Sequence, residues 1–234
     1  MESYRKIDMN AENALAKFMD ESLYSKMQDK HGRIKYQRVN DYQKQMEGID
    51  VIIESEGEIF YIDEKASLYY SNMMIPTFAF EIDSIQRKAD VPVEGWLVKD
   101  QLKTNYYMLI WPNIRCQMNQ QTRVCERVSL SEIKMSDFTI VEAMLIKKQR
   151  ILDYLESYDW TKRRMLAYAR EMRKECDTSE RPKREDINKD CYFYYTSDRA
   201  EKPINIVIKK GVLRLMAEAN YFISKENYAS IKKT

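Results

Sequence analysis

Three residues near the start of the chain have types and spacing that suit phosphodiester chemistry: Asp50, Asp63 and Lys65. Asp50 precedes an apolar run at 51–53, and a second run at 59–62 leads directly into Asp63. Side chains alternate across a β-strand, so Asp63 and Lys65 are expected on one face. Two carboxylates completed by water suit Mg²⁺, a hard cation that keeps much of its water shell. A lysine beside them suits stabilisation of negative charge on an attacked phosphate.

The elements that must position these residues are two strands joined by a tight turn. Residues 56–58 form a short polar connector that contains a glycine, which predicts an antiparallel hairpin. Such a hairpin brings Asp50 beside Asp63. Glu64 is expected to point to the opposite face with Ile62, so it is not assigned as a ligand.

This pattern resembles the PD-(D/E)xK nuclease superfamily over roughly residues 10–112. Asp50 matches the first acid, Asp63 the second acid and Lys65 the lysine, although Asp50 follows Gly48 and Ile49 rather than a proline. The resemblance implies an α/β, restriction-endonuclease-like fold, a mixed central sheet flanked by helices. It also implies an endonuclease that hydrolyses DNA phosphodiester bonds with Mg²⁺ or Mn²⁺ and an activated water, without a covalent intermediate.

The tripeptide alone is weakly specific, because 132–134 also fits it without a preceding strand that carries an acid. In the alternative interpretation, Asp63 and Lys65 form an incidental ion pair at a solvated strand end, and Asp50 is a turn residue. Carboxylates beside β-branched apolar runs favour the site, because a buried carboxylate needs a partner or a metal.

The first helix is expected over residues 10–27, with Asn10 as its N-cap. Its buried stripe comprises Ala11, Ala14, Leu15, Phe18, Ser22 and Leu23. The first helix of the resembled superfamily often supplies another carboxylate, and Glu12 and Glu21 flank the stripe. Glu21 is named as the further metal ligand, Glu12 remains the alternative, and a solvated helix edge competes with both.

Substrate contacts are expected from Gln45, just before the first acid, and from Arg163 and Arg164. The two arginines belong to residues 162–189, which hold ten Lys and Arg against six acids. Such a segment suits phosphate contacts that position nucleic acid, although a solvated helix face has the same composition.

Composition excludes several other classes. Hydrophobic residues make up 44% of the chain, with five glycines and five prolines, as in a folded domain. His31 is the single histidine, which disfavours histidine triads and histidine-ligated metals, and the phosphate-binding loop and dinucleotide glycine motifs are missing. The net charge of +2 means that DNA binding needs a local basic patch.

The expected location is the cytoplasm, without a membrane span. The four cysteines, at 116, 125, 176 and 191, show no CxxC pairing, so reduced thiols are expected rather than zinc. No apolar run is long enough to cross a bilayer, and the start of the chain lacks a signal-like apolar stretch. A homodimer is left open.

The expected organisation is a nuclease core at 1–130 and a helical and α/β C-terminal extension at 131–234, which can belong to the same domain. Residues 138–146 fit either a strand or a helix, and Asp159 is expected to cap a helix at 160–176. Strands are expected at 33–40, 77–82, 94–98, 105–111, 121–128, 191–195, 203–208 and 221–224, and a short helix at 209–217.

Two alternatives from other functional classes remain. One is a catalytically inactive module of the same fold that binds nucleic acid or protein. The other is a structural partner in which Asp63 and Lys65 are an ion pair. The sequence also leaves open DNA against RNA, and single against double strands.

Overall fold

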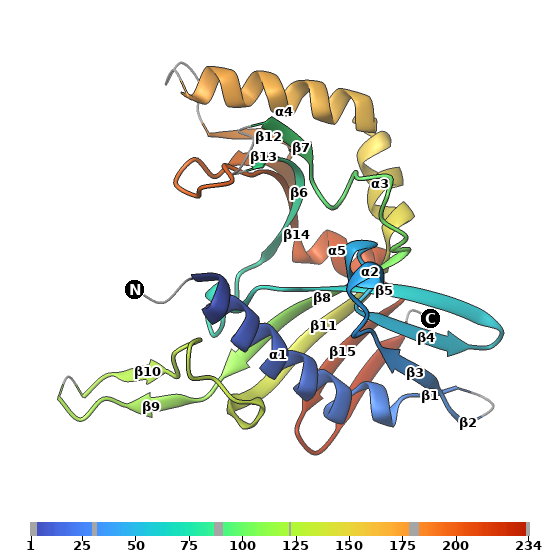
Figure 1. Cartoon of the computed structure of the whole chain (residues 1–234), viewed down its shortest axis with the longest axis vertical. Helices are drawn as coiled ribbons and strands as arrows, with labels where there is room; N and C mark the ends of the chain where they lie inside the picture. Colours follow the sequence, from blue (N-terminus) through green and yellow to red (C-terminus); the bar gives the residue numbers. More distant parts are fainter. Residues whose placement is uncertain (1–3, 30–31, 87–90, 122, 178–182, 233–234) are drawn as a thin grey trace.

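Two β-sheets of unequal size organise the chain in the computed structural model, which describes residues 4–29, 32–86, 91–121, 123–177 and 183–232 (Figure 1). In spatial order, the seven-stranded sheet contains β16 (Tyr228–Lys232), β15 (Ala219–Ser224), β11 (Phe138–Lys147), β8 (Tyr106–Ile114), β5 (Glu58–Ala66), β4 (Val51–Ser55) and β3 (Lys35–Arg38). The five-stranded sheet contains β12 (Arg184–Asn188), β13 (Cys191–Tyr195), β14 (Ile204–Lys209), β6 (Thr77–Gln86) and β7 (Val91–Glu94).

Two small ribbons and five α-helices complete the described fold, which is therefore mixed α/β. The ribbons are β1 (Gln28–Asp29) with β2 (Gly32–Arg33), and β9 (Cys116–Met118) with β10 (Cys125–Arg127). The helices are α1 (Tyr4–Ser22), α2 (Tyr42–Met46), α3 (Lys148–Glu156), α4 (Lys162–Asp177) and α5 (Lys210–Met216). Short 3₁₀ turns lie at Tyr24–Lys26, Leu68–Tyr70 and Met135–Asp137. No helix within the described ranges is long and apolar enough to cross a membrane.

Helix α1 covers one face of the seven-stranded sheet (Figure 1). All six residues of the predicted stripe are buried, and its apolar members pack against β4, β5, β8, β11 and β15. Burying a large apolar side chain contributes about 1.5–3 kcal/mol, so this stripe fixes where the helix lies.

The predicted start of this helix is wrong. α1 begins at Tyr4, so Asn10 lies inside the helix rather than at its N-cap. The Asn10 side-chain amide instead donates to the carbonyl oxygens of Leu130, Ser131 and Ile133 at 3.2–3.4 Å. A polar residue that suits a helix start therefore ties the helix to a loop more than a hundred residues away in sequence.

Strand β8 is buried on both faces and separates two hydrophobic cores. Tyr106, Met108 and Ile110 face the α1 core, whereas Tyr107 and Leu109 face a second core. That second core also contains the inner side chains of β6, β13 and β14 and those of α3, α4 and α5. The helices after residue 147 therefore lie between the two sheets or on the smaller one, not on the α1 face.

The predicted hairpin is confirmed. β4 pairs antiparallel with β5, with Val51 opposite Ile62 and Ser55 opposite Glu58. Glu56 and Gly57 both have positive φ, 52° and 84°, as the central residues of a type I′ turn require. β5 then pairs in parallel with β8, whereas the other described pairings are antiparallel, so the large sheet is mixed.

Two predicted boundaries differ from the structure. Pro112 does not end its strand: β8 continues to Ile114, because β5 no longer flanks it beyond Ile110 and the pairing with β11 is irregular there. Asp159 does not cap the following helix: α4 begins at Lys162, and the Thr161 hydroxyl accepts from the backbone of Arg164.

Two further segments were ambiguous or misassigned. Residues 138–146 are strand β11, and the helical rhythm is realised only from Lys148 onwards. A strand buried on both faces loses its two-residue alternation, which explains the ambiguity. The predicted strand at 94–98 is a turn after Glu94, since the backbone at Gly95 approaches Glu81 so closely that a Cβ would lie 2.4 Å from its carbonyl.

Neither sheet ends near residue 130. β11 and β15 pair into the sheet that contains β5 and β8, while β6 pairs with β14 in the other sheet. Each sheet therefore takes strands from both sides of the predicted boundary between the core and the C-terminal extension.

Candidate active site

A pocket of about 820 Å³ lies where α1 meets the start of β4 and the end of β5. Asp50, Asp63 and Lys65 line it together, as the sequence predicts, and Glu12 from α1 also lines it. Side chains alternate along β5, so Ile62 packs into the core under α1, whereas its neighbour Asp63 points to the other face of the strand and pairs with Lys65.

Asp63 and Lys65 form the centre of the site. Their carboxylate Oδ1 and ammonium Nζ lie 2.6 Å apart, and the Asp63 side chain is only 4% exposed. The Lys65 ammonium also lies over the Trp96 ring, 5.3 Å from its centroid. Trp96 reaches this position through the Gly95 turn, and it packs edge-on against Tyr107. Lys65 is therefore held between a carboxylate and an aromatic ring.

Asp50 is fixed by backbone contacts with the neighbouring strand. Its Oδ2 accepts the backbone N–H of Glu64 at 2.8 Å, and its own N–H donates to the carbonyl of Ile62. The chain enters this position through Gly48, whose φ of 76° favours glycine. The Thr104 hydroxyl donates to the Gly48 carbonyl, and a Cβ on Gly48 would lie 2.6 Å from that hydroxyl. The carboxylate is thus positioned before any ligand arrives.

The electrostatics of the pocket are unbalanced. Burial raises the pKa of Asp63 to about 7, the nearby Lys65 lowers it less than burial raises it, and the adjacent Asp50 raises it further. Burial lowers the pKa of Lys65, but Asp63, Asp50 and Glu12 outweigh this effect and leave it raised. Three carboxylates therefore act on one ammonium, and a second cation would relieve their mutual repulsion.

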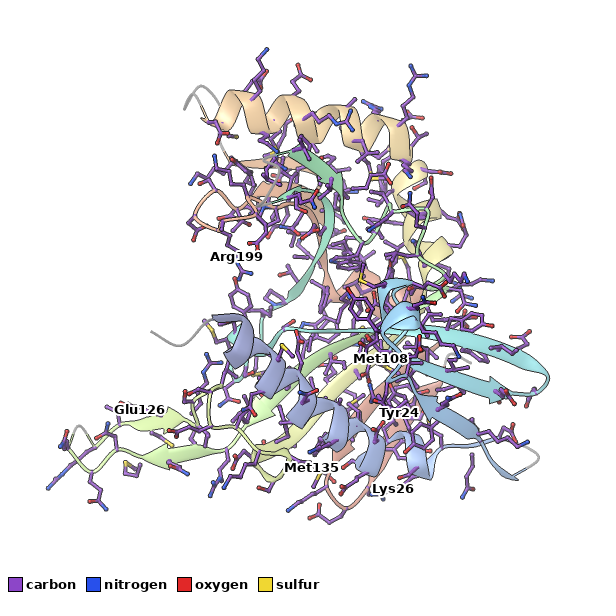
Figure 2. All side chains as sticks on the ribbon, viewed as in Figure 1. Tyr24, Lys26, Met108, Glu126, Met135 and Arg199 are labelled. Atoms are coloured by element: carbon purple, nitrogen blue, oxygen red, sulfur yellow. The ribbon has the colours of Figure 1, made fainter. Side chains whose placement is uncertain are left out.

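The opposite face of β5 carries a second group of charges, which we call the Glu64 cluster: Tyr24, Arg38, Asp20 and Glu64. Arg38 bridges the carboxylates of Asp20 and Glu64, and the Tyr24 hydroxyl donates to Glu64 at 2.7 Å. Figure 2 shows Tyr24 beside the sheet. Burial raises the pKa of Glu64, and Arg38 opposes this. Glu64 thus has a dedicated partner and lies on the predicted face.

The sequence interpretation missed Arg38, which also lines the pocket. The sequence did contain a signal for Arg38. It follows Ile34 and Tyr36 at two-residue spacing, so it lies on the same face of the strand as these core-packing residues. Glu64 follows Ile62 in the same way. When each of two nearby strands carries a charged residue on its core-facing side, a buried ion pair is indicated.

The structure distinguishes the two helix carboxylates. Glu12 lines the pocket and acts on Lys65, whereas Glu21 is exposed, does not line the pocket and lies near Tyr36 instead. Of these two helix carboxylates, Glu12 is therefore the one that lies in the pocket with Asp50 and Asp63. The two residues are nine positions apart, which places them on different sides and turns of the helix.

The predicted substrate residues lie in different places. Gln45, in α2, lines the pocket and donates its amide to the Val39 carbonyl at 3.1 Å. Arg163 and Arg164 lie on α4, along the far side of the smaller sheet from α1 (Figure 1), and neither lines the pocket. Arg164 stacks 4.4 Å from the Trp160 centroid. The structure thus brings Gln45, but not the two arginines, to the acids. His31 lies outside the described residues.

A magnesium ion fits the donor chemistry of the pocket. Mg²⁺ is usually bound by one or two carboxylates, with waters and substrate phosphates completing its shell. Asp50 and Asp63 supply such a pair, and the pKa of Asp63 is raised partly by Asp50, a repulsion that a cation removes. Among the described residues, no group of three or more His, Cys, Asp or Glu side chains is arranged to hold a metal by itself. A Mg²⁺ ion bound there would need water or substrate to complete its shell.

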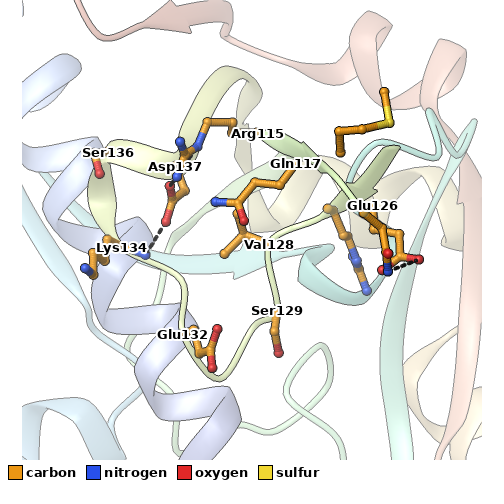
Figure 3. A pocket seen from close by; sticks show the side chains of 12 residues that line it. Arg115, Gln117, Glu126, Val128, Ser129, Glu132, Lys134, Ser136 and Asp137 are labelled. Carbon is orange, nitrogen blue, oxygen red and sulfur yellow. Dashed lines mark hydrogen bonds and ion pairs between the residues drawn. The ribbon is translucent and has the colours of Figure 1, made fainter. Parts of the chain in front are cut away.

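A second pocket, of about 870 Å³, lies at the base of the β9–β10 ribbon (Figure 3). Glu132 and Lys134 of the second tripeptide line it, and the Arg115 guanidinium lies 2.8 Å from Asp137. Of its three acids, Glu132 and Asp137 come from a loop and a 3₁₀ turn, and Glu126 comes from β10 of the ribbon. It therefore lacks the strand geometry of the first pocket.

Comparisons with known proteins add no assignment. The chain matches no protein-family model, no curated protein and no solved structure.

Proposed function

We propose that this chain is a metal-dependent endonuclease that hydrolyses DNA phosphodiester bonds. The observation that supports this most directly is that Asp50, Asp63 and Lys65 line one pocket, which Glu12 on α1 also lines. A buried ion pair needs one acid for each base. Here the negative charges of Asp63, Asp50 and Glu12 act on one lysine beside a pocket, which suits a divalent cation bound to a phosphate.

Each residue has a distinct part in this proposal. Asp50 and Asp63 hold Mg²⁺ or Mn²⁺, and Glu12 adds negative charge near the same position. When bound there, the cation would supply an activated water and positive charge beside the phosphate. Lys65, kept in place by Asp63 and Trp96, donates to the phosphate oxygen on which negative charge develops. Gln45, on the rim, is placed to orient the substrate strand.

The topology supports a restriction-endonuclease-like core as part of the same proposal. The sheet order β8–β5–β4–β3 combines an antiparallel hairpin with a parallel neighbour, and α1 covers one face. That is the mixed sheet with a flanking helix that the resemblance to PD-(D/E)xK nucleases implies.

The test is cleavage of supercoiled plasmid and of single-stranded DNA with Mg²⁺, with Mn²⁺ and with EDTA. The variants are Asp63→Ala and Lys65→Ala. The expected result is metal-dependent cutting that both substitutions reduce by about a thousandfold or more. Circular dichroism on each variant separates loss of chemistry from loss of fold.

The second tripeptide supplies matched controls. Glu132 and Lys134 repeat the same residue types on an exposed loop. Glu132→Ala and Lys134→Ala are expected to cut at the wild-type rate. If folded wild-type protein cuts neither substrate with either metal, the DNase proposal is rejected, and a DNA gel shift then shows whether an inactive binding module remains.

A further inference from the structure

A two-stranded ribbon projects from the seven-stranded sheet, and its residues 115–128 are called the arm here (Figure 1). β9 and β10 pair at only three positions, from Cys116 opposite Arg127 to Cys125 opposite Met118. The side chains of β9 are all exposed, as are those of Cys125 and Glu126 in β10. Figure 2 labels Glu126 on this projection. An isolated hairpin is marginally stable in water, so a ribbon that presents both faces to solvent is suited to a partner.

The side chains of the arm suit a negatively charged partner that also offers hydrogen-bond donors and acceptors, as DNA does. The arm contains three arginines, at 115, 123 and 127, and one acid, Glu126. Arg115 is paired with Asp137 outside the arm, which leaves Arg123 and Arg127 against Glu126. The remaining side chains include Gln117, Asn119, Gln120 and Gln121. Arginine, glutamine and asparagine are the side chains that pair bidentately with guanine and adenine edges in the major groove. Among the described residues of the arm, Met118 and Val124 are the only exposed large apolar ones.

The arm is anchored next to the candidate active site. The Arg127 guanidinium donates to the carbonyl of Leu68 at 3.1 Å, and Leu68 lines the same pocket as Lys65. Asn72 accepts the backbone N–H of Ile114 at 2.7 Å and donates to the Cys116 sulfur. The segment that follows the catalytic strand therefore holds the base of the arm, which fixes the arm relative to the acids.

We propose that the arm enters the major groove of duplex DNA beside the bond that the candidate active site cuts. The major groove is wide enough for a two-stranded β-ribbon. This inference rests on the proposed nuclease function and deepens it, because it names double-stranded DNA as the substrate and the arm as the element that reads it. Arg123, near the tip, contacts a nucleobase or a phosphate. Arg127 serves mainly to hold the arm where it joins the sheet.

The cysteines provide a footprint that does not depend on cutting. Cys116 and Cys125 on the arm are exposed, whereas Cys176 and Cys191 are buried. Cleavage by trypsin after Arg115, Arg123 and Arg127 puts the two arm cysteines in separate peptides. Mass spectrometry can therefore follow the alkylation of each thiol. The reduced protein is treated with N-ethylmaleimide in EDTA, alone, with a 30-bp duplex, and with a single strand of the same sequence.

The expected result is that duplex slows alkylation of both arm thiols by about fivefold or more, and that the single strand slows it less. Arg123→Ala is expected to weaken duplex binding by about tenfold in a gel shift. Lys189→Ala removes one exposed positive charge from the turn between β12 and β13, and it is expected to bind within twofold of wild type.

The inference is overturned if the duplex binds in a gel shift but both arm thiols are alkylated as fast as without DNA. It is also overturned if the single strand slows alkylation as much as the duplex does. Equal weakening by Arg123→Ala and Lys189→Ala also overturns it. Absence of any duplex binding overturns it as well. The footprint contains no metal, so these outcomes are separate from the cleavage assay that tests the nuclease proposal.

Discussion

The two sheets each bury an acid beside a base, but the two pairs differ in charge balance and access. In the five-stranded sheet, Asp83 pairs with Arg173 from α4, both side chains are less than a tenth exposed, and Arg173 also donates to the Lys202 carbonyl. In the seven-stranded sheet, Asp63 pairs with Lys65 while Asp50 adds a further negative charge, and all three line a pocket.

The comparison shows that buried charge alone does not indicate a site. Asp83 and Arg173 neutralise each other one to one and join α4 to β6, so their contribution is structural. Burial raises the pKa of Asp83, and its hydrogen bond with Arg173 and the positive charge of Arg173 oppose this. The Asp63 group has more acids than bases and opens on a cavity, which leaves a role for a cation from solution.

The largest expected effect separates activity from stability. Lys65→Met is expected to reduce cutting per folded molecule by about a thousandfold, because the phosphate loses its charged donor. It is also expected to lower the free energy of unfolding, because Asp63 loses its partner, but by less than Asp83→Ala does, because Asp63 can take up a proton. Single-turnover cleavage rates and urea unfolding measure the two quantities. If Lys65→Met were strongly destabilised but cut DNA at the wild-type rate per folded molecule, Lys65 would have a structural role, like Arg173.

Asp83→Ala is the converse experiment. It leaves Arg173 buried without its carboxylate, so the free energy of unfolding is expected to fall by about 3–5 kcal/mol. Binding of Mn²⁺ to the protein that remains folded is expected to be unchanged, as measured by calorimetry at low temperature. Loss of metal affinity without loss of stability would contradict the contrast between the two pairs.

The pH dependence of metal binding sharpens the comparison. With the pKa of Asp63 at about 7, protons compete with a cation below that pH. The affinity for Mn²⁺ is expected to fall about tenfold for each pH unit below 7 and to level off above 8. Calorimetric titrations from pH 5.5 to 8.5 test this. Asp63→Asn should flatten the profile, and a wild-type profile that is already flat would contradict the prediction.

The two helix carboxylates give a smaller effect. Glu12→Gln removes a negative charge from the pocket and is expected to weaken Mn²⁺ binding by up to about tenfold. Glu21→Gln makes the same chemical change at an exposed position of α1 and is expected to have no measurable effect. Equal responses would show that the charge of the helix, rather than the position of Glu12, matters.

The smallest effect is expected on α4. Arg163→Ala removes an exposed charge on the far side of the five-stranded sheet and is expected to change DNA affinity by less than about twofold. Fluorescence anisotropy with a labelled duplex measures it. A tenfold loss would restore the original prediction for this residue and would show that the second sheet takes part in binding.

The sequence predicted the parts of the site that depend on local alternation. The two-residue period of β5 places Asp63 and Lys65 on one face and Glu64 on the other. The turn at 56–57 sets the register of β4 against β5, which places Asp50 beside Asp63. Glu12 could not be chosen over Glu21 on this basis, because that choice depends on how α1 crosses the sheet.

Long-range packing accounts for the misplaced boundaries. Asn10 was a reasonable N-cap by residue type, but its amide bonds with the 130–133 loop, a contact that local pattern does not reveal. Residues 143–146 lack an alternating pattern because Ala143 and Leu145 face the core under α1 whereas Met144 and Ile146 face the second core. The five-stranded sheet was not predicted as a unit, since it joins β6 to strands more than a hundred residues later.

The interleaving of the two sheets has a consequence for how the protein folds. β3, β4 and β5 are consecutive and can pair as soon as they are synthesised, so the acids of the pocket come together early. β6 must wait for β14, which follows more than a hundred residues later. Closing so long a loop costs conformational entropy and slows folding. Until β14 has left the ribosome, one edge of β6 lacks its partner strand, and this unpaired edge makes the nascent chain prone to aggregate.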